Sequence, residues 1–185
     1  MYHKDKDIYE GEWVDDKANG YGIYMHKDGA IYEGGWVNDI QEGQGKEIWP
    51  DGSIFIGEFR NGKKNGRGKF NWSDGSEYEG ELFNNNIEGI GLYTWADKRY
   101  YNGFWKNNKM EGEGIFIWPD GRKYQGGYKD DKKHGLGIFE WSDGRKYCGQ
   151  WFNGAQHGEG EFFHPAQNNW KKGIWNNGKL EKLEE

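Results

Sequence analysis

Residues 9–31 read YEGEWVDDKANGYGIYMHKDGAI, and the same arrangement of aromatic residues and glycines returns every 23 residues. The first residue of each repeat, called position 0 below, is aromatic, and positions 2, 11 and 13 are glycine. Successive repeats begin at Tyr9, Tyr32, Phe55, Tyr78, Tyr101, Tyr124 and Tyr147. Self-similarity at a fixed period of roughly 20 to 50 residues is typical of repeat proteins, in which each repeat packs only against its neighbours.

The conserved spacing inside each repeat predicts β-strands. Rings and glycines alternate with period two, which indicates strands rather than helices. Position 4 is usually a ring, position 15 is usually aromatic, and position 17 is Trp in most repeats. Positions 19 and 20 usually read Asp-Gly, a strong hairpin signal because glycine supplies the positive φ that a tight turn needs. Each repeat therefore predicts two short antiparallel strands followed by a turn into the next repeat.

The pattern also predicts a pairing register. We expect position 0 to lie opposite position 15, position 2 opposite 13, and position 4 opposite 11, all on one face of the sheet. Across the turn, we expect position 17 to lie opposite position 0 of the next repeat. Rings then lie beside glycines, whose missing side chain leaves room for them. The other face carries charged and aliphatic residues and is expected to be solvated.

The joint pattern Y-x-G-x-W, G-x-G and D-G resembles the MORN repeat, as in YEGEWVDDKANGYGIYMHKDG and YQGGYKDDKKHGLGIFEWSDG. The resemblance implies an all-β fold, an elongated single-layer antiparallel sheet or solenoid of stacked MORN-repeat hairpins. We expect the seven repeats of 9–169 at 9–31, 32–54, 55–77, 78–100, 101–123, 124–146 and 147–169. Residues 1–8 are expected to form a partial N-terminal repeat, and 170–185 a degenerate terminal repeat or cap. Leu180 and Leu183 fit a short helical turn over the last strand, and a frayed tail fits equally well.

Composition alone would suggest disorder, since mean hydropathy is −1.18 and 30% of residues are charged. The 18% aromatic content, with 11 Trp and 12 Tyr, indicates instead a core built of rings. The net charge of −6 disfavours a protein that mainly binds nucleic acid. The start, MYHKDKDIYEGEW, has no apolar run, so we expect no secretory signal. The single Cys148 fits a reducing compartment, and we expect a cytoplasmic protein.

The sequence predicts no enzyme, no catalytic residue, no metal site and no cofactor. Histidines recur at equivalent positions, 10 in His134 and His157 and 17 in His26 and His164, so the repeat explains them without a metal. The G-x-G pairs lack a third glycine and precede a strand, unlike a dinucleotide-binding loop. Cys148 has no evident paired base.

The ring-lined face is the predicted partner-binding surface, because large rings are common anchors of protein interfaces. The partner is expected to be a protein, as an amphipathic helix or an extended segment, and self-association is a further expectation. The bland alternative, that the rings form only the core, stays open. The MORN resemblance implies a scaffold in ciliary or cytoskeletal assemblies. The predicted contact residues are Tyr9, Trp13, Tyr32, Trp36, Phe55, Phe59, Tyr78, Tyr101, Trp105, Tyr124, Tyr128, Tyr147 and Trp151.

A second hypothesis is contact with a membrane. Two lysine pairs, Lys63-Lys64 and Lys132-Lys133, fall at equivalent positions that the pattern places in loops on one edge. Lysines there could contact anionic lipid headgroups at about 1 kcal/mol per charge. The neighbouring Asp130-Asp131 offsets one pair, and ordinary solvated turn lysines explain both pairs as well.

Overall fold

The computed structural model describes residues 7–183, which fall into an N-terminal half ending at Gly89 and a C-terminal half beginning at Ile90. The N-terminal half contains β1 (Ile8–Val14), β2 (Lys17–Met25), β3 (Ile31–Val37), β4 (Ile40–Ile48), β5 (Ile54–Arg60), β6 (Lys63–Asn71) and β7 (Glu77–Phe83). Strand β8 (Asn86–Thr94) runs through the boundary. The C-terminal half continues with β9 (Tyr100–Lys106), β10 (Lys109–Ile117), β11 (Lys123–Lys129), β12 (Lys132–Glu140), β13 (Lys146–Phe152), β14 (Ala155–His164), the 3-10 turn η1 (Pro165–Gln167), β15 (Asn169–Asn176) and β16 (Lys179–Leu183).

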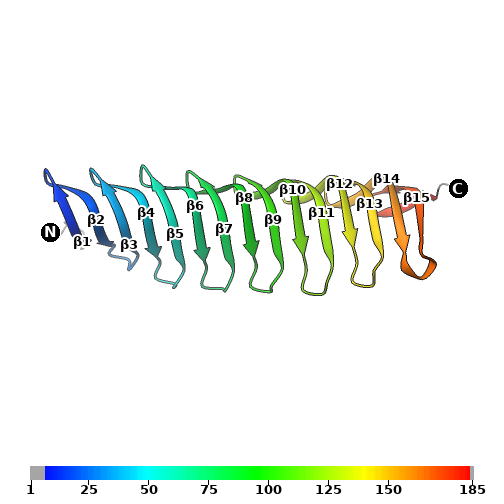
Figure 1. Cartoon of the computed structure of the whole chain (residues 1–185), viewed down its shortest axis with the longest axis horizontal. Helices are drawn as coiled ribbons and strands as arrows, with labels where there is room; N and C mark the ends of the chain where they lie inside the picture. The colour runs from blue at the N-terminus through cyan, green and yellow to red at the C-terminus, as the bar shows by residue number, and fades with distance from the viewer. Residues whose placement is uncertain (1–6, 184–185) are drawn as a thin grey trace. The chain divides into compact units, whose positions relative to one another are not determined.

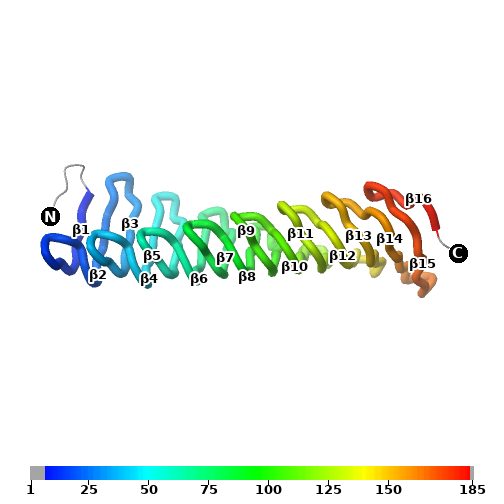
Figure 2. The backbone as a smooth tube through the Cα atoms, turned by 90° about the horizontal axis from the view of Figure 1, so that it is seen from above, coloured from blue at the N-terminus to red at the C-terminus, as the bar shows by residue number. Residues whose placement is uncertain are grey.

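Within each half, every strand is antiparallel to the next strand along the chain (Figure 1). The hairpins of a half follow one another in the same orientation (Figure 2). The predicted all-β, single-layer antiparallel fold is therefore confirmed. Residues 1–6, which belong to the predicted partial repeat 1–8, and residues 184–185 lie outside the described part of the chain.

The register within a hairpin confirms two predicted pairs and corrects the third. In the first repeat Tyr9 lies opposite Tyr24 and Gly11 opposite Gly22, as predicted for positions 0–15 and 2–13. Position 4 lies opposite position 9, not 11, so that Trp13 pairs with Ala18. The cause is a bulge, since residues 19–21 lie opposite residue 12, and the glycine at position 11 takes a φ of 79° in this repeat.

The register between repeats is also shifted from the prediction. Position 15, not 17, lies opposite position 0 of the next repeat, as in the pair Phe70↔Tyr78. The turn is longer than a two-residue hairpin, because Trp49 N–H donates to Ser53 O (2.9 Å) and Gly52 N–H donates to Trp49 O (2.9 Å). Asp51 closes the loop by accepting the Ser53 N–H (2.9 Å). Because the shift is two residues, it keeps every ring on its predicted face.

The core of the sheet is a layer of rings lying on glycines. Position 0 rings are fully buried, with Tyr101 and Tyr124 0% exposed. A Cβ added to Gly137 would lie 2.6 Å from Tyr124 Cζ, too close for any side chain. The prediction that glycine makes room for rings is thus confirmed. Position 4 rings then pack edge-on against position 0 rings, as Trp105 does on Tyr101 at 5.1 Å between centroids and 88° between planes.

The C-terminal end differs from the predicted helical turn. Lys179–Leu183 form strand β16, which pairs with β15 through Trp175↔Leu180. Asn177 and Gly178 both take positive φ (48° and 83°) and form the turn between these strands. A strand is favoured over a helical turn here because it satisfies backbone groups along β15 that would otherwise be left at a sheet edge.

Candidate protein-binding site

The predicted contact rings are mostly interior. Of the thirteen, only Trp13 has substantial exposure (40%), while each of the other twelve is at most 8% exposed. The tyrosines among them are buried deeply enough to affect their hydroxyl groups, and burial raises the pKa of Tyr32 and of Tyr147 to about 12. The twelve rings therefore make the packed interior of the sheet, and a partner approaching the chain first meets the rings beside them.

Those neighbouring rings occupy positions 15 and 17, close to the Asp-Gly turns. In the C-terminal half they form a continuous series in which each ring centroid lies 4.3–5.8 Å from the next. We call this series the ring ladder. Its members are Tyr93, Trp95, Phe116, Trp118, Phe139, Trp141 and Phe162.

The ring ladder has a buried side and an accessible side. Phe116 and Phe139 are buried, whereas the three tryptophans are half-buried and present part of each indole to solvent. Phe139 also approaches the buried Trp151 at 6.2 Å, which attaches the ladder to the core layer. The sequence signal for the three tryptophans is their place two residues before the turn dipeptide, Asp-Gly in most repeats. Each of them is half-buried because it is the first residue of the turn.

The structure corrects the predicted loop placement of the two lysine pairs. The two lysine pairs lie in strands β6 and β12, not in loops, and consecutive side chains of a strand point to opposite faces. Lys63 and Lys132 are exposed, whereas Lys64 and Lys133 lie opposite the core rings Phe59 and Tyr128. Each pair therefore places only one lysine on the solvated face.

Lys64 and Lys133 both lie among rings, but only one of them has a counter-charge. Lys64 Nζ forms an ion pair with Glu47 Oε2 and lies 5.0 Å from the Trp49 ring centroid. Glu47 is at position 15, where the other six repeats carry an aromatic residue. Glu47 thus replaces the usual ring at position 15, and its carboxylate pairs with a lysine of the next repeat.

Lys133 Nζ lies within a cage of four rings. The centroid distances are 4.8 Å to Phe139, 5.0 Å to Trp151, 5.4 Å to Tyr124 and 5.5 Å to Trp118. Within residues 7–183 no carboxylate forms an ion pair with it. Burial, together with the nearby charge of Arg122, lowers the pKa of Lys133 to about 8.

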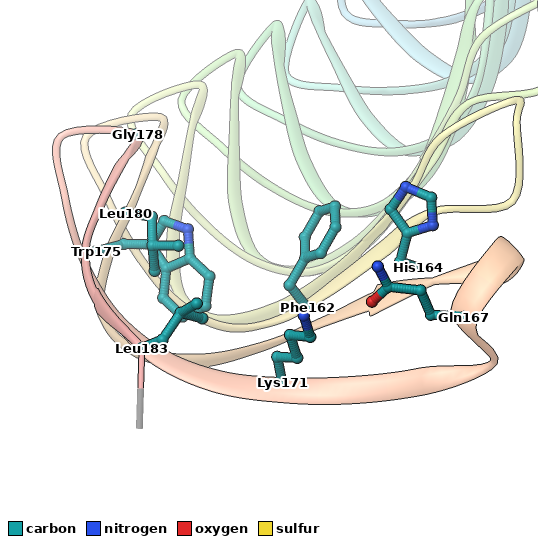
Figure 3. Close-up of a pocket in the computed structure, with 8 residues that line it drawn as sticks. All are labelled: Phe162, His164, Gln167, Lys171, Trp175, Gly178, Leu180 and Leu183. Atoms are coloured by element: carbon teal, nitrogen blue, oxygen red, sulfur yellow. The ribbon is translucent and has the colours of Figure 1, made fainter. Parts of the chain in front are cut away.

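A pocket of about 340 Å³ lies at the end of the C-terminal half. It is lined mainly by side chains of β14, β15 and β16, including Phe162, Trp175 and Leu180. Figure 3 shows these side chains turned toward the inside of the bend that the strands make. Since Phe162 is also the last member of the ring ladder, the apolar surface extends from the ladder to this end.

Residues 7–183 contain no group of three or more His, Cys, Asp or Glu side chains arranged to hold a metal ion. No helix among those residues is long and apolar enough to cross a membrane.

Comparison with protein families decides what the repeat is. The MORN repeat family matches residues 9–31, 32–54, 55–77, 78–98, 101–121, 124–144 and 147–166. The chain belongs to the MORN-repeat family. A comparison of this MORN-repeat protein with curated proteins finds no match.

Solved structures share the fold at low sequence identity. The Sas-4 (dCPAP) TCP domain of Drosophila melanogaster, in complex with a proline-rich motif of Ana2 (dSTIL), is 9% identical with a TM-score of 0.55. The alignment covers 91% of the MORN-repeat chain and 90% of that domain. The TCP10c domain of Drosophila melanogaster Sas-4 is likewise 9% identical, with a TM-score of 0.49 and coverages of 92% and 99%. At such identities the likeness shows the fold alone.

Proposed function

We propose that this protein is a non-enzymatic scaffold that binds a segment of a partner protein along the ring ladder. The observation that carries the proposal is the row of half-buried tryptophans, Trp95, Trp118 and Trp141, linked by buried phenylalanines. Partly exposed indoles over a rigid sheet supply large contact area at low entropic cost, as interface anchors do. An amphipathic helix or an extended segment would suit such a surface.

The proposed setting is a cytoskeletal or ciliary assembly in the cytoplasm. The MORN resemblance implies a scaffold of this kind, and the Drosophila Sas-4 TCP domain was solved with a proline-rich motif of Ana2 bound. Both points support a protein partner for the present chain, but the likeness of fold does not identify the partner. Lipid contact has less support, because each lysine pair leaves only one lysine on the solvated face.

The test compares an exposed ring on each face. Trp118→Ala removes a ladder ring, and Phe104→Ala removes a ring that is 48% exposed and precedes the buried Trp105 in β9, so it lies on the other face. We expect Trp118→Ala to lose a stoichiometric protein captured from extract, while Phe104→Ala retains it and circular dichroism shows both folded.

The same preparations are tested against vesicles of phosphatidylcholine and phosphatidylserine. Salt-sensitive binding that disappears with Lys63→Ala and Lys132→Ala, and that does not change with Trp118→Ala, would overturn the scaffold in favour of membrane contact. Equal capture by wild type and Trp118→Ala would also count against the ring ladder.

A further inference from the structure

The two ring-caged lysines provide an internal comparison. Lys64 and Lys133 occupy position 9 of their repeats, and both lie over the position 17 tryptophan of the preceding repeat and the position 0 ring of their own. At the first site, Glu47 of the preceding repeat supplies the carboxylate. At the second site the equivalent residue is Phe116, which has no charge. The two sites thus share a lysine and two rings at equivalent positions, and only the first has an anion from the preceding repeat. Their other rings differ, since Lys64 also lies over Phe59 and Lys133 over Phe139 and Trp151.

The Lys133 ammonium is incompletely satisfied by its surroundings. Aromatic faces attract a cation, but they do not accept the three strong hydrogen bonds that an ammonium group can donate. Within residues 7–183 its Nζ has no hydrogen-bonded oxygen. The cation is therefore held in a half-buried position where an incoming oxygen anion would meet little competition from the protein itself.

The local charge around this site is positive. Trp118 has Lys133 Nζ at 5.5 Å and Arg122 Cζ at 5.3 Å from its ring centroid. Arg122 is paired with Asp120 through Nε and Oδ2 at 2.8 Å, so one of the two cations is already balanced. The site as a whole has an excess of one positive charge beside an accessible indole. One carboxylate would neutralise it.

We propose that Lys133 binds a carboxylate side chain of a partner protein, which takes the place that Glu47 takes beside Lys64. The inference rests on the proposed scaffold function and names the chemistry of the bound segment. Apolar side chains on either side of the acidic residue contact the ring ladder. The partner segment is thus apolar with one Asp or Glu at the level of Trp118.

Charge and geometry favour a protein carboxylate over a polyanion. A nucleic acid or an anionic membrane presents many negative charges, and this chain has 31 acidic residues against 25 basic ones. The single uncompensated cation suits a single anionic group, and the rings along the ladder suit the apolar residues next to it.

The test is a selection of random peptides displayed on messenger RNA, carried out with the full chain. Two variants accompany the wild type. Lys133→Met is expected to fold, because Met110 occupies the same position of the neighbouring repeat and lies opposite Trp105 in the same way. Lys132→Met is the matched control, since it removes an equal charge from an adjacent, exposed position.

We expect peptides selected on wild type to be apolar with an Asp or Glu at one position, and those selected on Lys132→Met to be the same. Changing that acid to its amide should weaken binding to wild type about tenfold, as loss of a charged hydrogen bond does. On Lys133→Met the acid and the amide should bind within about twofold of each other.

Four other results would contradict the Lys133 inference. They differ in whether they also contradict the proposed scaffold function. Selected peptides that bind the ring ladder but have no acidic position would contradict the Lys133 inference and leave the proposed scaffold function in place. An acid-to-amide effect of equal size on Lys133→Met does the same. Absence of any binding peptide removes the proposed function as well. A dimer in sedimentation that Lys133→Met dissociates would mean that a second copy of this chain occupies the site.

Discussion

The Glu47–Lys64 site in the N-terminal half and the Lys133 site in the C-terminal half share two rings at equivalent positions, but they differ in position 15 of the preceding repeat and in the remaining rings around the lysine. Where that residue is Glu47, the lysine is neutralised within the chain. Where it is Phe116, the ring ladder runs on without interruption and the lysine is left with rings alone. The comparison teaches that the residue at position 15 of one repeat decides whether the lysine of the next repeat has a counter-charge within the chain.

The largest expected effect concerns the packing of the position 0 ring against the glycine at position 13, which occurs at both sites. Gly68→Ala and Gly137→Ala each place a Cβ against the position 0 ring, 2.5 Å from Phe55 Cζ and 2.6 Å from Tyr124 Cζ respectively. Because neighbouring backbone surrounds these rings, we expect each variant to lower the free energy of unfolding by roughly 3 kcal/mol or more. Thermal melts followed by circular dichroism measure this.

Gly135→Ala is the control for these variants. A Cβ there has nothing within 4 Å, but its φ of 74° is unfavourable for alanine. The expected loss is therefore only about 1–2 kcal/mol. A loss as small for Gly137→Ala would show that the Tyr124 ring can move aside to admit the added methyl group.

Replacing the lysine by methionine should change the free energy of unfolding in opposite directions at the two sites. Lys64→Met leaves Glu47 without its partner, and we expect a loss of about 1–2 kcal/mol, reduced from that of a fully buried pair by partial exposure. Lys133→Met removes an unpaired, half-buried charge, and we expect a gain of about 1–2 kcal/mol. Urea unfolding of both variants decides the comparison, and losses of equal size in both would contradict it.

The open site can be converted into the closed form. Phe116→Glu places a carboxylate where Glu47 stands relative to Lys64, so it should compete with an acidic peptide for Lys133. We expect about tenfold weaker peptide binding than in Phe116→Gln, which loses the same ring without gaining a charge. Fluorescence anisotropy of a labelled peptide measures both affinities. Equal affinities for the two variants would show that Lys133 does not contact the peptide acid.

The stability of the open site should depend on pH. The pKa of Lys133 is about 8 when folded, below the roughly 10.4 of an unfolded lysine, so the unfolded chain binds this proton more tightly. Raising the pH from about 8 to about 10 therefore removes the penalty, and the advantage of Lys133→Met should shrink over that range. Arg122 and Tyr124, which face Lys133, are present in both proteins, so the difference in Tm between wild type and variant isolates the lysine. A constant difference would contradict the lowered pKa.

The smallest effect is expected at the exposed neighbours. Lys63→Ala and Lys132→Ala should each change the free energy of unfolding by less than about 0.5 kcal/mol and leave peptide binding unchanged. If Lys132→Ala weakened the binding of an acidic peptide as much as Lys133→Met does, the attraction would be long-range. That result would contradict a direct contact between Lys133 and the carboxylate of the peptide.

Much of this fold could be predicted, because local rules and the repeat agree. Period-two spacing indicates strands, Asp-Gly indicates turns, and the pairing of glycines with rings follows from the room that a ring needs beside a backbone. The family, the fold class and the pairs Tyr9↔Tyr24 and Gly11↔Gly22 were all accessible in this way.

The shift of register could not be predicted from the same rules. It depends on how many residues the turn takes up, and hydrogen bonds such as Trp49 N–H to Ser53 O decide that number. Likewise, the bulge at Gly20 moves position 9 onto the ring face and places Ala18 opposite Trp13. One correction concerns the turn between repeats and the other a bulge inside strand β2, and at both places the alternation that guides a prediction is interrupted.

The sequence by itself determined that rings and glycines share one face of an antiparallel sheet, because side chains alternate along any strand. Only the tertiary structure decided which rings are core and which are surface. Neighbouring repeats bury position 0 and, except at Trp13, position 4, and the long turns leave the position 17 tryptophans half-buried. It also decided that Lys133 lies among rings without an anion, because the position from which a carboxylate would reach it belongs to the preceding repeat, 17 residues earlier in the chain, and is occupied by Phe116.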